Sequence, residues 1–260
     1  MTTMPSEKTG PWLERTARDK SARLRLFCFP YAGGGTMIYR GWAASLPAGV
    51  ELCPVHLPGR ERRMREPCIT DARELARAAA TALRPYFDVP FALFGHSMGA
   101  LIGFELARAL RRDGGPEPAH LFVSGHYAPQ LPREKTPTYD LPEPEFIEEL
   151  RRLNGTPREV MEHPELMQLM IPILRADFKL VQTYAYADEP PLGCPITAFG
   201  GEFDPEVSRD SLAAWREQTS GAFSLQMFPG DHFFIHAQSA LLLRALAPRL
   251  EAAAGGKGAR

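Results

Sequence analysis

The chain of 260 residues has the length of one large α/β domain or two small ones. Its 30 basic and 31 acidic side chains give a formal net charge of −1, so no global field favours nucleic acid or an anionic membrane. The N-terminal stretch MTTMPSEKTG lacks the apolar core of a signal peptide, and no apolar run approaches the roughly 20 residues that span a bilayer. We therefore expect a cytoplasmic protein that binds neither nucleic acid nor membrane, with flexible ends at 1–20 and 252–260.

Six short apolar runs predict β-strands, and four helical patterns alternate with them. The strand runs cover 24–29, 51–56, 91–95, 120–125, 195–200 and 223–228, and the helical patterns cover 70–83, 98–112, 208–219 and 239–253. Several of the strand runs are apolar on both faces, which is typical of strands covered by helices on each side. The alternation predicts an α/β fold with a mostly parallel, doubly wound sheet, as a single domain over 1–260.

The stretch 131–190 interrupts this alternation, because it contains no strand pattern. LPEPEFIEELRRLNG predicts a short helix ended by Gly155, and Thr-Pro and His-Pro pairs at Pro157 and Pro164 indicate two further helix starts. The last helix is long and apolar, and we expect Pro172 to kink it. We interpret 131–190 as a helical lid over the C-terminal edge of the sheet. The alternative is an ordinary packed subdomain.

The string FGHSMG lies where a predicted strand, FALF, meets a predicted helix, MGALIGFELARAL. A serine between two glycines in that context is a nucleophile elbow, in which the sharp turn crowds the neighbouring positions. Gly95 and Gly99 remove side chains from those positions, and Ser97 stands at the helix N-terminus, where the helix dipole favours developing negative charge. The sequence therefore predicts a serine nucleophile.

A serine nucleophile needs a base and an acid that orients it, and in this fold they follow in the order acid, then histidine. His232 follows the last predicted strand in PGDHFF, at the edge where such sites lie. Asp204 follows the preceding strand in GGEFDP. His236 and Glu202 are the alternatives for the base and the acid.

An oxyanion hole for this chemistry requires two backbone N–H groups. We expect one from Met98, which follows the nucleophile, and one from Ala32 in the loop PYAGGGT, with Tyr31 or Gly33 as alternatives. The glycines let the backbone of that loop approach a ligand closely. The loop lacks the G-K-[ST] ending and the G-x-G-x-x-G spacing of phosphate-binding loops.

The cysteines indicate neither a metal site nor a disulfide framework. Cys28, Cys53, Cys68 and Cys194 form no CxxC pair, and no histidine stands at zinc-ligand spacing from them. We expect free thiols, a reducing compartment, and no cofactor or metal.

Seven segments together resemble the type II thioesterases that accompany modular polyketide and nonribosomal peptide synthases. They are FPYAGGG, HLPGRERR, LFGHSMGALIGFELAR, GTPREV, PELMQLMIPILRADF, GGEFDPEVS and FPGDHFFI, and the resemblance runs from about residue 23 to 247. GHSMG is shared by many hydrolases, whereas its combination with PYAGG and PELM…LRADF is much more specific.

The resemblance implies the α/β-hydrolase fold and an enzyme that hydrolyses acyl thioesters on the phosphopantetheine arms of carrier domains, removing stalled or wrongly primed acyl groups. It implies that Ser97, Asp204 and His232 are the catalytic residues and that Ala32 and Met98 are the oxyanion donors. It further implies carrier domains of a modular synthase as partners, and we expect a monomer.

Two interpretations concern substrate and partner. On the long lid helix, side chains at spacings of three and four share one face, which we expect to contact the acyl chain unless it packs on the sheet. They are Leu166, Met167, Met170 and Leu174. The segment 60–65 holds four arginines that could dock an acidic carrier domain; the alternative is a solvated loop in which Arg60 bonds backbone carbonyls.

Two other functions fit the triad. A general carboxylesterase would use the same residues, because a triad does not distinguish an ester from a thioester. A hydrolase-fold protein that only binds its ligand would keep the pocket without turnover.

Overall fold

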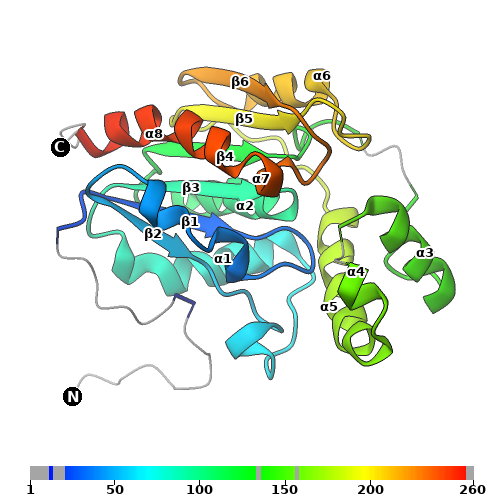
Figure 1. The fold of residues 1–260 in the computed structure, drawn as a ribbon. Helices are drawn as coiled ribbons and strands as arrows, with labels where there is room; N and C mark the ends of the chain where they lie inside the picture. The colour runs from blue at the N-terminus through cyan, green and yellow to red at the C-terminus, as the bar shows by residue number, and fades with distance from the viewer. Residues whose placement is uncertain (1–11, 14–20, 133–135, 156–157, 256–260) are drawn as a thin grey trace, which may run out of the picture.

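A computed structural model describes residues 12–13, 21–132, 136–155 and 158–255. Its centre is a six-stranded sheet in the order β2-β1-β3-β4-β5-β6, with parallel pairing between all neighbours (Figure 1). The strands are β1 (Leu24–Phe29), β2 (Val50–Pro54), β3 (Phe91–His96), β4 (His120–Ser124), β5 (Ile196–Gly201) and β6 (Phe223–Phe228). The predicted parallel sheet is confirmed.

Helices cover both faces of the sheet, as the doubly apolar strands require. One face carries α1 (Ala72–Leu83) and α2 (Met98–Arg112), and the other carries α7 (Phe234–Ala237) and α8 (Ser239–Gly255) (Figure 1). Successive side chains of a strand point to opposite faces. Accordingly, Phe27 and Leu93 are buried with α1 and α2, whereas Leu26 and Phe94 are buried with α8.

The predicted strand and helix ends agree with the structure within two residues, apart from one helix, and the C-terminal tail also differs. The helix expected over 208–219 is a short α6 (Arg209–Ala213) followed by the 3₁₀ helix η5 (Ala214–Gln218), in which the fully buried Trp215 donates its indole N–H to His126 O at 2.7 Å. Helix α8 continues to Gly255, so the C-terminal tail predicted to be flexible is helical over 252–255. The rest of that tail, and most of the N-terminal segment predicted to be flexible, lies outside the described residues.

Four further 3₁₀ helices lie in the loops. They are η1 (Thr36–Tyr39), η2 (Trp42–Ser45), η3 (Glu61–Arg63) and η4 (Arg84–Tyr86). Of these, η1 and η3 border the loop after β1 that is central to the site. Among the described residues, no helix is both long and apolar enough to cross a lipid bilayer.

The insertion between β4 and β5 is helical and lies beside the ends of the strands (Figure 1). It contains α3 (Glu143–Leu153), α4 (Arg158–Met161) and α5 (Pro164–Gln182), and its described residues form no strand. It has a small core of its own, made by Phe146, Leu150, Met167, Ile171 and Leu174.

The ends of the lid helices follow the predicted signals in part. Helix α5 begins at Pro164 and continues past Pro172 to Gln182. Asn154, rather than Gly155, ends α3 in the left-handed conformation, with φ 53°. Glycine at position 155 is explained by packing, because a Cβ there would lie 2.5 Å from the ring of Phe233. The predicted start at Pro157 lies outside the described residues.

Candidate active site

The turn between β3 and α2 has the geometry of a nucleophile elbow. Ser97 lies there at φ 53° and ψ −118°, a strained conformation for a residue with a side chain. A Cβ on Gly95 would lie 2.0 Å from Gly99 O, and a Cβ on Gly99 would lie 2.0 Å from Phe29 O. Both positions therefore exclude any side chain, which is the reason the pattern needs glycine at each of them.

Strand β4 holds the elbow in place. The Ser97 N–H donates to Ser124 O at 2.7 Å, and His96 Nδ1 lies 2.9 Å from Ser124 Oγ. His96 is fully buried, and this burial lowers its pKa well below 6.5. The imidazole next to the nucleophile therefore stays neutral and acts as a packed support.

Two loops bring His232 and Asp204 together. His232 Nδ1 lies 2.7 Å from Asp204 Oδ2, and the other carboxylate oxygen accepts the N–H groups of Glu206 at 2.8 Å and Val207 at 3.2 Å. The Asp204 side chain is completely buried, and that of His232 is 15% exposed. The carboxylate is thus held by backbone donors and orients the imidazole.

The alternative acid and base lie elsewhere. Glu202 is exposed to solvent. His236 Nε2 lies 2.9 Å from the Tyr31 hydroxyl, and this residue is also exposed. The histidine–carboxylate pair in this pocket is therefore formed by the residues that chain order favours.

All three residues of the predicted triad line one cavity of about 880 Å³, together with Ala32 and Met98. The backbone N–H of Gly33, one alternative oxyanion donor, donates to Asp177 Oδ2 at 2.7 Å. It is therefore unavailable to a substrate oxygen. The Gly34 N–H closes a turn onto Tyr31 O at 2.9 Å.

The lid face that lines this cavity differs from the predicted one. Of the four predicted contacts, Leu174 lines the cavity, whereas Leu166 is 44% exposed and Met167 belongs to the core of the lid. Met170 does not line the cavity. It points to the glycine-rich loop 30–36 after β1, called the glycine loop below, with its Cε 3.6 Å from where a Cβ of Gly33 would lie.

The observed apolar lining from the lid continues the same helical stripe toward the C-terminus. On α5 it consists of Leu174, Phe178 and Val181, and α3 adds Leu150 and Leu153 from its last turn. The spacing of 174, 178 and 181 is the i, i+4, i+7 pattern of one helix face. The period was visible in the sequence, but the turn at which the stripe meets the cavity was not.

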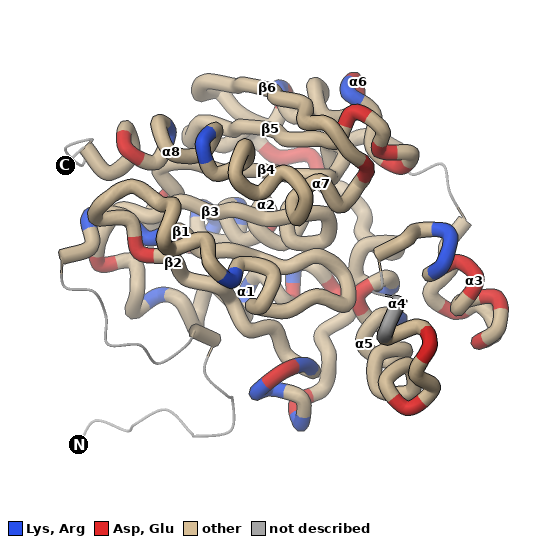
Figure 2. The backbone as a smooth tube through the Cα atoms, in the orientation of Figure 1, with Lys and Arg blue, Asp and Glu red and all other residues tan. Residues whose placement is uncertain are grey.

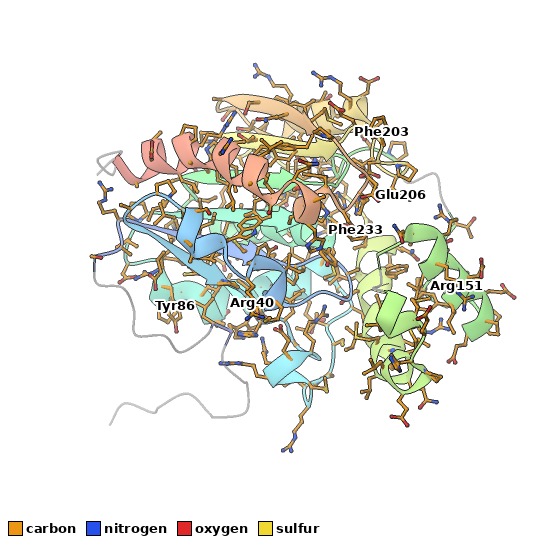
Figure 3. The ribbon with its side chains drawn as sticks, viewed as in Figure 1. Arg40, Tyr86, Arg151, Phe203, Glu206 and Phe233 are labelled. Carbon is orange, nitrogen blue, oxygen red and sulfur yellow. The ribbon has the colours of Figure 1, made fainter. Side chains whose placement is uncertain are left out.

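Exposed residues of α3 and of the loop that carries Asp204 line the cavity. Figure 3 shows Phe203, Glu206 and Phe233 at the edge of the sheet that faces the lid. Phe203 lines the cavity and is 74% exposed. Arg152 of α3 reaches across to Glu206, with Nη1 3.1 Å from Oε1.

The arginine-rich segment 60–65 is partly internal. Arg60 is buried in an ion pair with Asp177 of α5, and Arg63 is buried with Nη1 donating to His56 O at 2.9 Å. Arg62 and Arg65 are exposed. The segment is therefore neither a patch of four free arginines nor a wholly solvated loop.

The four cysteines are free thiols. Burial raises the pKa of Cys53 and of Cys194 to about 12, so neither forms a thiolate near neutral pH. Among the described residues, no group of three or more His, Cys, Asp or Glu side chains is arranged to hold a metal ion.

Comparison with known proteins places this geometry in a family. The Thioesterase domain family matches residues 24–251. The gramicidin S biosynthesis protein GrsT of Aneurinibacillus migulanus is 47% identical over 229 residues, which cover 88% of this chain and 90% of that protein.

Two solved structures are similar over almost the whole chain. RedJ, a thioesterase from the prodiginine biosynthetic pathway in Streptomyces coelicolor, has a TM-score of 0.84 at 40% identity, covering 88% of this chain and 91% of that one. BorB, the type II thioesterase from the borrelidin biosynthetic cluster, has a TM-score of 0.83 at 36% identity, covering 94% and 100%. This chain therefore belongs to the thioesterase domain family, as a type II thioesterase with the α/β-hydrolase fold.

Proposed function

We propose that this thioesterase hydrolyses acyl groups from the phosphopantetheine arms of carrier domains, and so clears stalled or aberrant acyl chains in polyketide or nonribosomal peptide synthesis. The observation that carries the proposal is the strained Ser97 elbow, which shares one cavity with a His232–Asp204 pair at 2.7 Å. The similarity to GrsT and BorB supports the biosynthetic setting.

In the first half-reaction, Ser97 attacks the thioester carbonyl carbon. His232 takes the hydroxyl proton, and Asp204 stabilises the imidazolium through the Nδ1–H bond. The carbonyl oxygen becomes an oxyanion, which the N–H groups of Ala32 and Met98 receive. Collapse of this intermediate breaks the C–S bond and leaves the acyl group on Ser97.

The leaving group distinguishes a thioester from an oxygen ester. A thiol has a pKa of about 8.5, far below that of an alcohol, so the departing sulfur needs less help from His232 as an acid. The departing thiolate takes the proton from the His232 imidazolium and leaves as the free thiol. The neutral His232 then takes a proton from water, which attacks the acyl-serine, and returns that proton to Ser97 Oγ as the free acid leaves. The reaction uses side chains, backbone donors and water, and we propose that it needs no cofactor or metal.

The cavity suits acyl chains rather than very small acids. Its volume of about 880 Å³ and its apolar lining from Leu150, Leu174 and Phe178 can remove a hydrocarbon chain from water. Thr138 and Gln182 add polar groups to the wall. We propose that the partner carrier domain remains outside, that its arm enters at the mouth beside Phe203, and that the enzyme acts as a monomer.

The test is a panel of acyl groups of increasing length, each loaded on the phosphopantetheine arm of a carrier domain. We expect release of free acid and carrier thiol with the wild-type enzyme and none with Ser97→Ala. Matched oxygen esters of the same acids provide the comparison. A higher kcat/KM on the esters than on every carrier-bound thioester would favour a general carboxylesterase. Binding of an acyl chain without its release would favour a ligand-binding protein.

A further inference from the structure

A buried ion pair joins the lid to the loop segment 59–66. Arg60 Nη2 lies 2.6 Å from Asp177 Oδ1, and Nη1 lies 2.7 Å from Oδ2, so the pair is bidentate. The two side chains are 7% and 2% exposed. Because apolar residues often replace a buried ion pair at no cost in stability, stability alone is a weak reason for this pair.

The same carboxylate holds the glycine loop after β1. Asp177 Oδ2 accepts the Gly33 N–H at 2.7 Å, and Arg60 Nη1 also donates to Gly34 O at 3.2 Å. One helical turn before Asp177, Leu174 lies against the loop, with its Cδ2 2.5 Å from where a Cβ of Gly33 would stand. Helix α5 thus contacts the Ala32–Gly33 peptide through both a polar and an apolar side chain.

A second carboxylate holds the other end of the loop. Glu61 Oε1 accepts the Thr36 N–H and the Thr36 hydroxyl, each at 2.9 Å, and Glu61 Oε2 lies 2.8 Å from His56 Nδ1. Glu61 has φ 49°, a strained value for a residue other than glycine. Adjacent residues 60 and 61 therefore hold both ends of the loop.

We propose that Asp177 and Arg60 are positioning residues that set the oxyanion hole from the lid. The pair fixes the Ala32–Gly33 peptide, so that the neighbouring Ala32 N–H stays aimed at the substrate oxygen. An oxyanion donor works only within about 2.7–3.1 Å of that oxygen, and a misplacement of 1 Å can cost about 10²-fold in rate. This inference rests on the proposed function in one respect, namely that Ala32 is an oxyanion donor.

The first test is Asp177→Asn, which keeps the side-chain shape and removes the charge. We expect kcat to fall about 10- to 100-fold while KM changes less than about threefold, because the effect is on the transition state. Measurement far below the melting temperature keeps the variant folded. Labelling of Ser97 by a fluorophosphonate, whose phosphoryl oxygen occupies the oxyanion hole, should slow by a similar factor.

A double variant separates positioning from stability. Arg60→Met with Asp177→Leu replaces the pair by apolar side chains, so the melting temperature should recover relative to Asp177→Asn. With Leu at position 177 the Gly33 N–H has no side-chain acceptor, whereas Asn keeps one oxygen that can accept it, so kcat of the double variant should stay low. Recovery of kcat together with the melting temperature would overturn the proposal, as would a kcat within twofold of wild type in Asp177→Asn. If Asp177→Asn does not fold, the double variant is compared with wild type, and a wild-type kcat in it would overturn the proposal.

Glu105→Gln is the matched control. Glu105 is a fully buried carboxylate that pairs with the buried Arg108 on α2, away from the glycine loop. Its loss should lower the melting temperature and leave kcat unchanged. All rates are measured on p-nitrophenyl propionate as well as on the carrier-bound thioester. Failure of wild type on the thioester alone would count against the proposed function, while the ester still tests the positioning pair.

Discussion

Helices α3 and α5 belong to one insertion, yet they are attached to the sheet in different ways. Helix α5 is held by the buried Arg60–Asp177 pair, whereas α3 reaches the sheet loops through Arg152 and Glu206, whose side chains are 49% and 23% exposed. Figure 2 shows charged residues of both signs along α3. Losing one partner of a buried pair costs about 3–5 kcal/mol, whereas an exposed pair contributes about 0–1 kcal/mol.

Helices α3 and α5 of the lid are therefore attached to the sheet with different strength. Helix α5 behaves as part of the body, because its side chains take part in fixing the glycine loop. Helix α3 contacts the loop that carries Asp204 through a partly exposed ion pair, and Phe146 and Leu150 attach it to α5 through the apolar core of the lid. Opening for a carrier-bound arm is therefore expected at α3, on the μs–ms scale of lid motions.

The largest expected effect lies outside both helices. Ser97→Ala should abolish turnover, since loss of a triad serine costs on the order of 10⁶ in kcat in a comparable hydrolase. The variant should still bind acyl chains, because the lid is intact. Stopped assays with the purified variant measure this, and residual activity above a few per cent of wild type would exclude Ser97 as the nucleophile.

Asp204→Asn should come next, with a loss on the order of 10⁴ in kcat. The amide no longer stabilises the imidazolium on His232, while the backbone donors to position 204 keep the loop folded. Glu202→Gln on the same loop is the control and should retain normal kcat. A near-normal rate for Asp204→Asn would transfer the role to Glu202.

The substrate-facing side of α5 can be tested with Val181→Trp, which fills part of the cavity. We expect kcat/KM to fall roughly 10- to 100-fold for octanoyl thioesters and to change little for propionyl, since each buried methylene contributes about 0.8 kcal/mol. Leu166→Trp, on the exposed side of the same helix, should be neutral. Equal losses on both acyl lengths, with a lowered melting temperature, would mean that Val181 serves packing.

Acid should destabilise the sheet more than the lid. Burial lowers the pKa of His120 in β4 from 6.5 to about 4, whereas His163 in the lid is exposed. The unfolded chain takes up the His120 proton first, so stability present above pH 6.5 is lost as the pH falls toward 4, by up to roughly 3 kcal/mol. Denaturant midpoints measured against pH should show a shallower slope for His120→Gln; an unchanged slope would exclude this histidine as the cause.

The smallest effect on stability is expected from loss of the Arg152–Glu206 ion pair. Arg152→Ala should lower the free energy of unfolding by at most about 1 kcal/mol, or about 2–4 °C in melting temperature. Hydrogen exchange should nevertheless speed up in α3 and stay unchanged in α5. Equal acceleration in both helices would show that the lid moves as one body, contrary to the comparison above.

The sequence predicted the parts of the site that depend on local pattern and chain order. The glycines on either side of Ser97 predict a sharp turn, because a side chain at position 95 or 99 would clash with the backbone. The positions of Asp204 and His232 follow from the strands that precede them. The Arg60–Asp177 pair joins residues 117 apart and leaves no local signature. The lid residues that line the cavity differ from the predicted ones for a related reason. Helical periodicity places Met170 and Leu174 on one side, but tertiary packing decides which turn of the helix meets the cavity.

The insertion also has a consequence for how the chain is made. Strand β5 pairs with β4, yet the whole lid is synthesised between them. During translation, β1, the glycine loop and Arg60 are therefore available before α5 emerges, while β5 is still missing. Asp177 can bind Arg60 at that stage and hold the apolar face of α5 against the nascent sheet. The ion pair therefore joins two segments that are both synthesised before the sheet can be completed by β5.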